Sequence, residues 1–294
     1  MEPAGLRTAE RARFALAWRC LDSADALSAR AFREGAYEVS IKSDHSPMLD
    51  LEVRIERAIE ASIRRAFPGD AVVGEELGGT AEEASLWVID PIDGTSNFVE
   101  GLPAYAHMIC YVRRARPRFS LVSAPLLGRR WWAVSGAGAF ESGRRLTVSS
   151  VDRLEGARIA YGGLRDYGPD TQGMVRLITA CARSRGFGNF LPHMLVAEGT
   201  YDIASSGAGG AVWDVVPLDL IVSEAGGRLT SLTGGLWSDG EAVVTSNGLL
   251  HTAALRKVGA VTQGPVVLRG ASTGTPNPGP RSGPRTAPPA AASE

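Results

Sequence analysis

Apolar residues recur at helical spacing in two stretches near the N-terminus. In residues 6–34 they fall on one helical face until Gly35, and in 48–67 they recur at four-residue steps until Pro68 and Gly69. Glycine or proline just past a periodic stretch is a typical helix end. The pattern therefore predicts two long helices at the start of the chain.

Shorter apolar runs follow, and most of them have strand character. "AVVGEELGG" indicates a short strand entering a glycine-bounded loop, "SLWVID" a buried strand, and residues 95–98 the start of a helix or turn. Runs with hairpin spacing follow between 106 and 150. From 157 onward strands alternate with helices, and the helices are expected near 171–183, 192–199 and 213–225. The fold class predicted is α/β, a layered α+β architecture.

Composition divides the chain into a folded part and a tail. The alternation predicts one domain over 1–263 in two unequal halves, about 1–150 and 151–263. Residues 264–294 contain seven prolines and few large apolar side chains. Such a segment cannot bury enough apolar surface to offset the entropy of ordering, so we expect disorder there.

The charge balance limits the classes of partner. The chain has 31 basic and 32 acidic residues, which leaves no overall field to attract a nucleic acid polymer or an anionic membrane. No apolar window is long enough for a signal peptide or a bilayer span, and the three cysteines match no metal or redox spacing. We expect a cytoplasmic protein whose charged ligand is met by a local group of residues.

The stretch "WVIDPIDGTSNF" carries the first candidate chemistry. Asp90 closes an apolar strand and Asp93 follows a stiff Pro-Ile turn, so the two carboxylates can share a hard cation. The carbonyl of Ile92 adds a neutral oxygen. The next three residues would offer backbone N–H groups to phosphate oxygens at a helix start. These three residues are Gly94, Thr95 and Ser96.

Two more acidic positions strengthen this interpretation. Alone, Asp-Gly-Thr is an ordinary turn. However, Glu75 lies in "GEE" after a predicted strand, and Asp214 starts the helix of "VWDVVPLDLIVSEAGGRL". Individually, Glu75 would more often be a solvated side chain and Asp214 a helix cap. Metal ligands beside phosphate donors are the layout of a metal-assisted phosphoryl-transfer site.

Together, "GEE", "DPIDGTSNF" and "WDVVPLDLIVSEAGG" resemble, in order and wording, the inositol monophosphatase family of magnesium-dependent phosphatases. The resemblance spans roughly residues 8–255. "VSAPLLGRRWWAVSGAGAF" and "LVAEGTYDIA" look closer still to its bacterial histidinol-phosphate phosphatase branch. The resemblance implies alternating α-β-α-β-α layers and a homodimer.

It also implies roles for individual residues. One magnesium ion would lie among Glu75, Asp90 and the Ile92 carbonyl, and a second among Asp90, Asp93 and Asp214; a third, weaker ion would lie near Glu75. The Thr95 hydroxyl would orient the attacking water, and Lys42 occupies the place of a loop lysine near the metals. The substrate-binding set implied comprises Glu75, Ile92, Asp93, Gly94, Thr95, Ser96, Asn189 and Asp214.

The chain departs from the family pattern at three positions. In "PMLDLE", Leu49 replaces a threonine and Glu52 replaces the aspartate that partners the motif threonine. Glutamate keeps the carboxylate but moves it by one methylene, and small misplacements affect rate. Gly207 stands where the family often has a glutamate that contacts the alcohol part of the substrate.

Asn189 is either a substrate contact or a loop residue with a local backbone bond.

These observations predict a magnesium-dependent phosphatase that hydrolyses a small phosphate monoester by two-metal activation of water, without a covalent intermediate. The substrate is either histidinol phosphate or a sugar phosphate or nucleoside monophosphate of a specialised pathway such as antibiotic biosynthesis. The alternative is a catalytically attenuated relative that binds metal and phosphate as a regulator or scaffold. The changes at Leu49 and Glu52 motivate that alternative.

Overall fold

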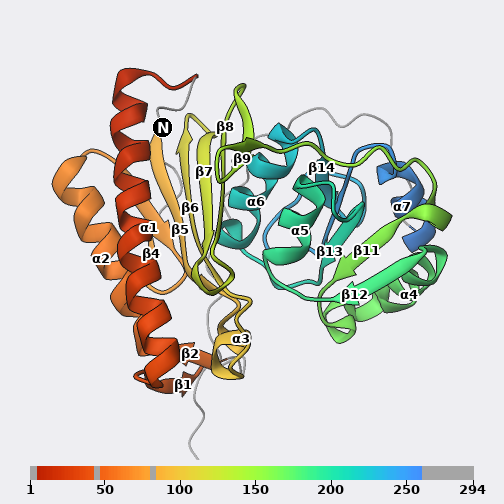
Figure 1. The fold of residues 1–294 in the computed structure, drawn as a ribbon, viewed down its shortest axis with the longest axis horizontal. Helices are drawn as coiled ribbons and strands as arrows, with labels where there is room; N and C mark the ends of the chain where they lie inside the picture. The colour runs from red at the N-terminus through yellow and green to blue at the C-terminus, as the bar shows by residue number, and fades with distance from the viewer. Residues whose placement is uncertain (1–4, 43–46, 80–83, 260–294) are drawn as a thin grey trace, which may run out of the picture. The chain divides into compact units, whose positions relative to one another are not determined.

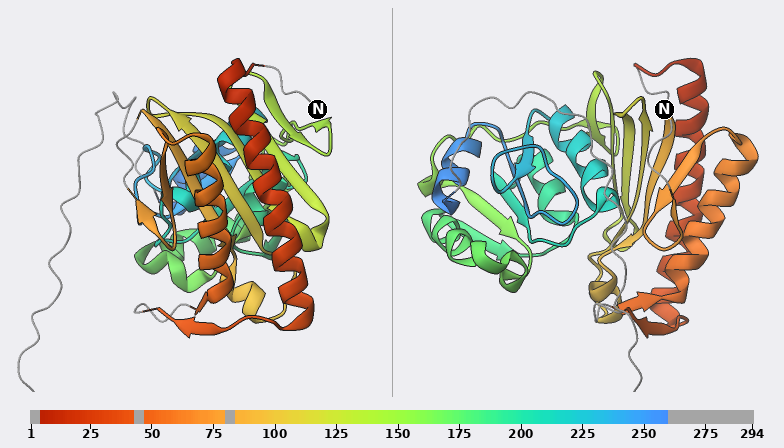
Figure 2. Two further views of the ribbon diagram at one scale, coloured as in Figure 1. Left: turned by 90° about the vertical axis from the view of Figure 1, so that its left-hand side faces the viewer. Right: turned by 180° about the vertical axis from the view of Figure 1, so that it is seen from behind.

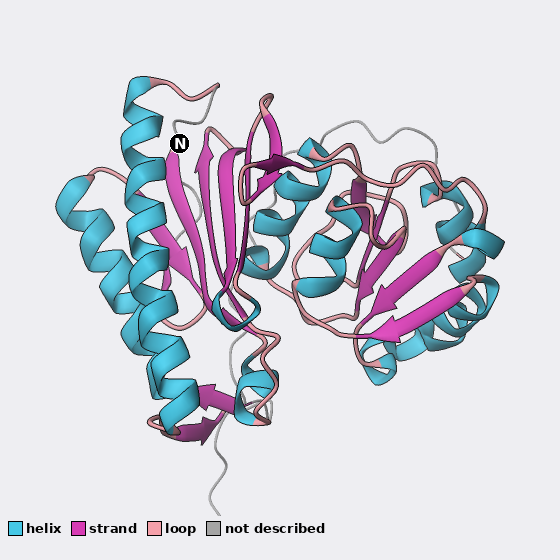
Figure 3. Cartoon of the chain, in the orientation of Figure 1, coloured by secondary structure: helices cyan, strands magenta, loops and turns pink. Residues whose placement is uncertain are grey.

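Helices and sheets alternate through the computed structural model, which describes residues 5–42, 47–79 and 84–259 (Figures 1 and 3). Helices α1 and α2 cover one face of an eight-stranded sheet, and α5 and α6 lie between that sheet and a five-stranded one. Helices α4 and α7 pack beyond the second sheet. The predicted α-β-α-β-α layering is confirmed. The predicted tail, 264–294, lies outside the described residues, and the boundary between the two halves stays a prediction.

The eight-stranded sheet has the order β10-β9-β8-β7-β6-β5-β3-β4. Strands β5 to β10 form successive antiparallel pairs, whereas β3 runs parallel to β5. A separate pair, β1 and β2, precedes α2. The strand bounds are Val39–Ile41 (β1), Pro47–Leu49 (β2), Ala71–Gly74 (β3), Gly78–Gly79 (β4), Ser85–Asp93 (β5), Ala106–Arg113 (β6), Arg116–Ala124 (β7), Arg129–Val134 (β8), Gly138–Glu141 (β9) and Arg144–Arg145 (β10).

The two N-terminal helices form where the apolar spacing predicts them. Helix α1 spans Thr8–Glu34 and α2 spans Asp50–Ala66. The four-residue repeat of α2 is fully buried against the sheet, and Gly35 ends α1 in the left-handed conformation (φ 65°) that glycine adopts without strain. Both helices lie across the same face of the sheet (Figure 2).

Strand β5 directs its side chains alternately to the two faces of the sheet. Trp87 and Ile89 belong to the core under α1 and α2, whereas Leu86 and Val88 belong to the opposite side, with residues of α6. Because successive side chains of a strand point to opposite faces, Asp90 continues the second set. The strand therefore directs Asp90 toward α6.

The second half is built on the five-stranded sheet, with the order β12-β11-β13-β15-β14. The predicted helix 171–183 is too long: α4 ends at Ala180, and 183–186 form the edge strand β12. Pairing with β11 decides this, because "RSRG" has no alternating apolar pattern. The remaining bounds are Thr95–Val99 (α3), Arg158–Tyr161 (β11), Thr171–Ala180 (α4), Arg183–Gly186 (β12), Leu191–Ala197 (α5), Ile203–Ser206 (β13), Val212–Glu224 (α6), Arg228–Ser231 (β14), Val243–Ser246 (β15) and His251–Val258 (α7).

Within the described ranges, no helix has the length and apolarity needed to cross a membrane. The three cysteines are free; Cys20 and Cys110 are buried, and Cys181 is half-buried.

A buried ion pair ties α1 to the start of the sheet. Asp70 accepts hydrogen bonds from Arg13 Nε (2.7 Å) and Nη2 (2.8 Å) and from Trp87 Nε1 (2.9 Å). The side chains of Arg13 and Asp70 are 16% and 4% exposed, and the guanidinium lies 4.2 Å from the centre of the Phe67 ring. One carboxylate thus satisfies donors from two elements.

Asp70→Ala is expected to lower the free energy of unfolding by about 3 kcal/mol, because it leaves a mostly buried guanidinium and an indole N–H unpaired. Denaturant unfolding measures the change. The control Asp152→Ala removes an exposed aspartate and should change stability by no more than about 0.5 kcal/mol. Equal effects of the two substitutions would contradict the role of Asp70.

Candidate active site

An irregularity in β5 brings two aspartates to one side of the sheet. Residues three apart in a regular strand point to opposite faces. The pairing of β5 with β6 shifts register between Asp90 and Asp93, where Pro91 supplies no N–H for the ladder. Asp90 lies opposite Met108 and Asp93 opposite Ala106. The irregularity therefore allows both carboxylates to face the same space.

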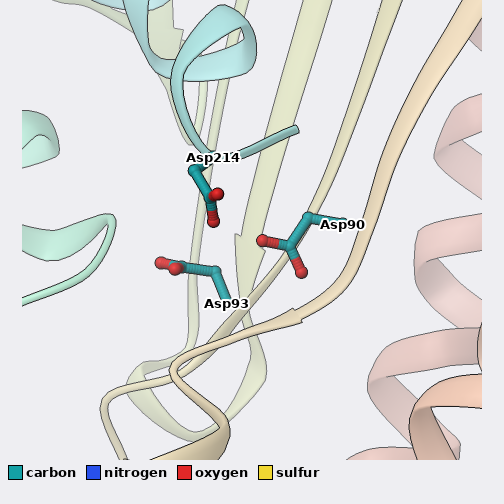
Figure 4. A group of neighbouring side chains, drawn as sticks. All are labelled: Asp90, Asp93 and Asp214. Carbon is teal, nitrogen blue, oxygen red and sulfur yellow. The ribbon is translucent and has the colours of Figure 1, made fainter. Parts of the chain in front are cut away.

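The N-terminus of α6 adds the third carboxylate. Asp214 Oδ2 accepts a hydrogen bond from the Ala211 N–H at 2.6 Å, so the residue does cap its helix. It also joins the strand aspartates: one carboxylate oxygen from each of Asp90, Asp93 and Asp214 lies within 4.8 Å of the others (Figure 4). The capping role and the proposed metal role are therefore compatible.

The cluster has the properties of a cation site. Asp90 is 1% exposed, and neither of its carboxylate oxygens has a hydrogen-bond partner among the described residues. A buried carboxylate without partners is costly unless a cation neutralises it. Oxygen-only donors suit a hard ion such as magnesium. The residues present therefore fit the metal that the sequence pattern implies.

Burial and mutual repulsion disfavour the charged forms of these acids. Burial and the charge of Glu75 raise the pKa of Asp90 well above its usual range. Burial and the charge of Asp214 raise the pKa of Asp93 to about 7, and burial raises the pKa of Asp214 to about 6. Ionising all three together requires a compensating positive charge.

Asn189 is a partner of the cluster. Its Nδ2 donates to Asp93 Oδ1 at 3.2 Å, and the neighbouring Phe190 N–H donates to Oδ2 at 2.5 Å. The backbone of Asn189 is left-handed (φ 57°), a conformation that asparagine tolerates better than most residues. Asn189 thus orients Asp93, and its predicted contact with substrate stays a prediction.

The "GEE" turn holds Glu75 beside the cluster. Lys42 Nζ donates to Glu75 Oε1 at 2.8 Å and to Glu76 Oε1 at 2.7 Å. Burial opposes the charge of Lys42, but these two carboxylates outweigh it and raise its pKa above the ordinary value. The positive charge of Lys42, which the sequence pattern places near a metal site, is therefore paired with the two carboxylates of this turn.

Glu56 anchors the same turn and was missed in the sequence. Its carboxylate accepts the N–H groups of Glu76 and Leu77, both at 2.9 Å. A side chain at Gly74 would collide with it, since a Cβ there would lie 2.2 Å from Glu56 Oε1. The sequence did offer one signal for Glu56: it is an acidic residue on the apolar face of the helix predicted over 48–67.

Glu52 joins Thr95 despite the departures from the family pattern. Its Oε1 accepts the hydroxyl of Thr95, and its Oε2 accepts the Leu49 N–H at 2.6 Å. Burial raises the pKa of Glu52 to about 7 even though both hydrogen bonds favour the charged form. Leu49 is fully buried in the core, so it packs where the family has a hydroxyl. The longer side chain reaches both donors.

A cavity of about 180 Å³ brings the predicted residues together. Gly94 directly precedes α3 and has φ 97°, and a Cβ there would lie 3.0 Å from the Ala104 carbonyl oxygen, so this position favours glycine. Of the predicted set, only Glu52 does not line this cavity; it reaches it through Thr95. The lining comprises Lys42, Pro47, Glu75, Asp90, Ile92, Asp93, Gly94, Thr95, Ser96, Asn189 and Asp214.

Comparison with known proteins identifies the family. Residues 11–263 match the inositol monophosphatase family over most of the chain. The chain belongs to this family. It is 40% identical over 253 residues to the histidinol-phosphatase of Mycobacterium tuberculosis, covering 83% of this chain and 97% of that protein. The histidinol-phosphatase of Streptomyces coelicolor is 38% identical over 245 residues, covering 80% and 92%.

Solved structures agree with this assignment. The IMPase of Thermotoga maritima superposes with a TM-score of 0.76 at 29% identity, covering 85% of this chain and 96% of that one. The predicted resemblance to the histidinol-phosphate phosphatase branch is confirmed by the two relatives above. This member of the inositol monophosphatase family is a phosphoric monoester hydrolase.

Asp93→Asn is expected to lower kcat by about a thousandfold or more, because the charge that a metal ion would balance is lost. The fold should persist, since an amide can still accept the Phe190 N–H. Phosphate release and circular dichroism measure the two effects. Asp219→Asn, a half-buried aspartate on α6 outside the cluster, is the matched control. A kcat equal to that of the wild type in Asp93→Asn would show that Asp93 is not a metal ligand needed for turnover.

Stabilisation by magnesium is expected to increase between about pH 5 and about pH 8. Without metal, folding raises the pKa values of Asp93 and Asp214 above the ordinary aspartate value of 3.8. Their protonated forms therefore stabilise the folded protein below about pH 3.8, and this stabilisation is lost as pH rises through about 6 to 7. A bound ion must displace the protons that these groups hold at low pH. At high pH and about 100 Kd of magnesium, the gain of about 2.7 kcal/mol raises Tm by roughly 5–10 °C.

The measurement is thermal unfolding at each pH with magnesium or with a chelator. Burial lowers the pKa values of His193 and His251 to about 4, which gives the opposite pH dependence. Because these histidines titrate in both samples, the difference in Tm between them isolates the carboxylates. A difference that does not grow with pH would show that the acidic cluster does not hold the ion.

Proposed function

We propose that this chain hydrolyses histidinol phosphate to histidinol and inorganic phosphate, with two magnesium ions at the acidic cluster. The observation that carries the reaction is the group of Asp90, Asp93 and Asp214, with Asp90 buried and without partners beside a cavity. The choice of substrate is supported by the identity to two histidinol-phosphatases over nearly their whole length.

The proposed sites divide between the strand end and the "GEE" turn. Glu75, Asp90 and the Ile92 carbonyl would hold one ion, and Asp90, Asp93 and Asp214 the other. When bound, such ions neutralise a phosphate dianion and acidify water. Lys42 lines the same cavity as Glu75 and donates to its carboxylate at 2.8 Å.

Thr95 and Glu52 would orient the attacking water. The Thr95 hydroxyl has two acceptors, Glu52 Oε1 and, at 3.2 Å, the Ile92 carbonyl oxygen. Donation of its single proton to Glu52, the shorter contact, would leave the Thr95 oxygen to accept a hydrogen bond from water. That water would attack phosphorus in line as the bond between phosphorus and the alcohol oxygen breaks. Of its two protons, one would remain on the phosphate and the other would end on the alcohol oxygen, so that the products are the alcohol and hydrogen phosphate. The backbone N–H groups at Gly94, Thr95 and Ser96 would hold the phosphate oxygens.

The contact between Glu52 and Thr95 argues against the attenuated alternative. A glutamate that could not reach the threonine would leave water unpositioned, whereas here one carboxylate serves both Thr95 and Leu49. The homodimer and the cytoplasmic location stay predictions. So does a sugar phosphate or nucleoside monophosphate of a specialised pathway as substrate.

We expect phosphate release from histidinol phosphate in magnesium, and loss of that release in a chelator. A panel containing inositol 1-phosphate, glycerol 2-phosphate, a hexose phosphate and a nucleoside monophosphate should show a lower kcat/KM, by about tenfold or more. A higher kcat/KM for the hexose phosphate or the nucleotide would show that histidinol phosphate is not the preferred substrate. Hydrolysis of no monoester would favour the attenuated alternative.

A further inference from the structure

A larger cavity, of about 360 Å³, adjoins the phosphate cavity. The two share Glu75, Asp93, Asn189 and Asp214 in their linings. The larger one extends from these residues to the five-stranded sheet, where Ser206 and Val243 line it. A cavity of this size is within the usual range for small-molecule sites. The alcohol part of a phosphate monoester held at the cluster would lie in it.

Gly207 lines this cavity, and its missing side chain has a structural cause. A Cβ at Gly207 would lie 2.3 Å from the Cβ of Asp166 and 2.8 Å from its carbonyl oxygen. The same carbonyl accepts the Ala208 N–H at 2.8 Å. The backbone of Asp166 therefore occupies the space that a glutamate at 207 would need. The segment that fills the space beside position 207 carries an acid of its own, Asp166.

Asp166 offers its carboxylate at the same place. It lines the cavity, and its Oδ2 lies 2.5 Å from where a Cβ of Gly163 would be, so glycine on that side also makes room for it. Asp166 is exposed, and no other described residue forms a hydrogen bond or an ion pair with its carboxylate. It is therefore available to a ligand.

The charges around the larger cavity favour a cation. Glu241 is a second acid in the lining away from the metal cluster, and none of the described residues that line it is a lysine or arginine. His193 lines it too, held between Ser206 Oγ and Thr245 Oγ1 at 2.8 Å each. Burial lowers its pKa to about 4, so it is neutral near pH 7. A cleft with charges of one sign attracts the opposite charge.

We propose that Asp166 binds an ammonium group on the alcohol part of the substrate, so that this site selects phosphate monoesters of cationic amino alcohols. The proposal rests on the proposed phosphatase function and names a residue that determines its specificity. Neutral alcohols such as glycerol and inositol gain nothing from this carboxylate. A second phosphate on the alcohol would be repelled by it.

Asp166→Asn tests the proposal, because it removes the charge and keeps the shape. We expect KM for histidinol phosphate to rise about tenfold or more, as for loss of a charged hydrogen bond. KM for glycerol 2-phosphate and both kcat values should stay within about twofold. Asp170→Asn, an exposed aspartate in the same segment but outside this lining, is the matched control and should change neither substrate.

Gly207→Ala gives a second, independent variant. The added Cβ must displace the backbone of Asp166, so KM for histidinol phosphate should rise while kcat with glycerol 2-phosphate is kept. Equal effects of Asp166→Asn on the two substrates, or no effect on either, would overturn the proposal while the phosphatase function stands.

A binding measurement separates the two proposals. Ligand-observed NMR with histidinol alone should detect binding to the wild type and weaker binding to Asp166→Asn. If no monoester is hydrolysed but this difference is seen, the phosphatase function fails and the ammonium site stands. If histidinol does not bind the wild type, or binds both proteins equally, the ammonium site is wrong.

Discussion

Three carboxylates lie together in the interior, and their mutual repulsion is the constraint on which the site depends. A register irregularity in β5 and the first turn of α6 hold Asp90, Asp93 and Asp214 within a few ångströms of one another. Such a group is unfavourable in its charged form unless a cation is present. The surrounding contacts keep it in place: Asn189 and Phe190 hold Asp93, and a helix cap holds Asp214. The protein thus stores an unfavourable arrangement that a metal ion would relieve.

The fold supplies this arrangement through ordinary rules of packing. Alternation along β5 sends its large apolar side chains under α1 and α2 and leaves Asp90 on the side of α6. The layers on either side bury both faces of the sheet, and the strand end that carries the acids opens into the cavity of about 180 Å³. A glycine at 94, with its positive φ, then turns the chain into α3.

The sequence predicted the parts that depend on local pattern or on motif wording. Helices α1 and α2, the strand before Asp90 and the layered fold follow from apolar spacing and from family resemblance. Strand β12 did not, because its sequence is polar and only its pairing with β11 makes it a strand. Glu56 was missed although it lies inside the apolar stripe of a predicted helix, because its packing against Gly74 cannot be seen in the sequence. Asp166 was missed because only the fold brings it against Gly207. The grouping of Asp90 with Asp214 was available only because the motifs are shared by a family.

The packing at Gly207 has a consequence for how this protein can change over time. With the backbone of Asp166 filling the space above it, position 207 accepts no side chain until the segment around 163–166 has moved. A glutamate at 207 would therefore require this segment to move, and that movement would displace the Asp166 carboxylate. Positions 207 and 166 are thus sterically coupled: a side chain at 207 and the present placement of Asp166 exclude each other.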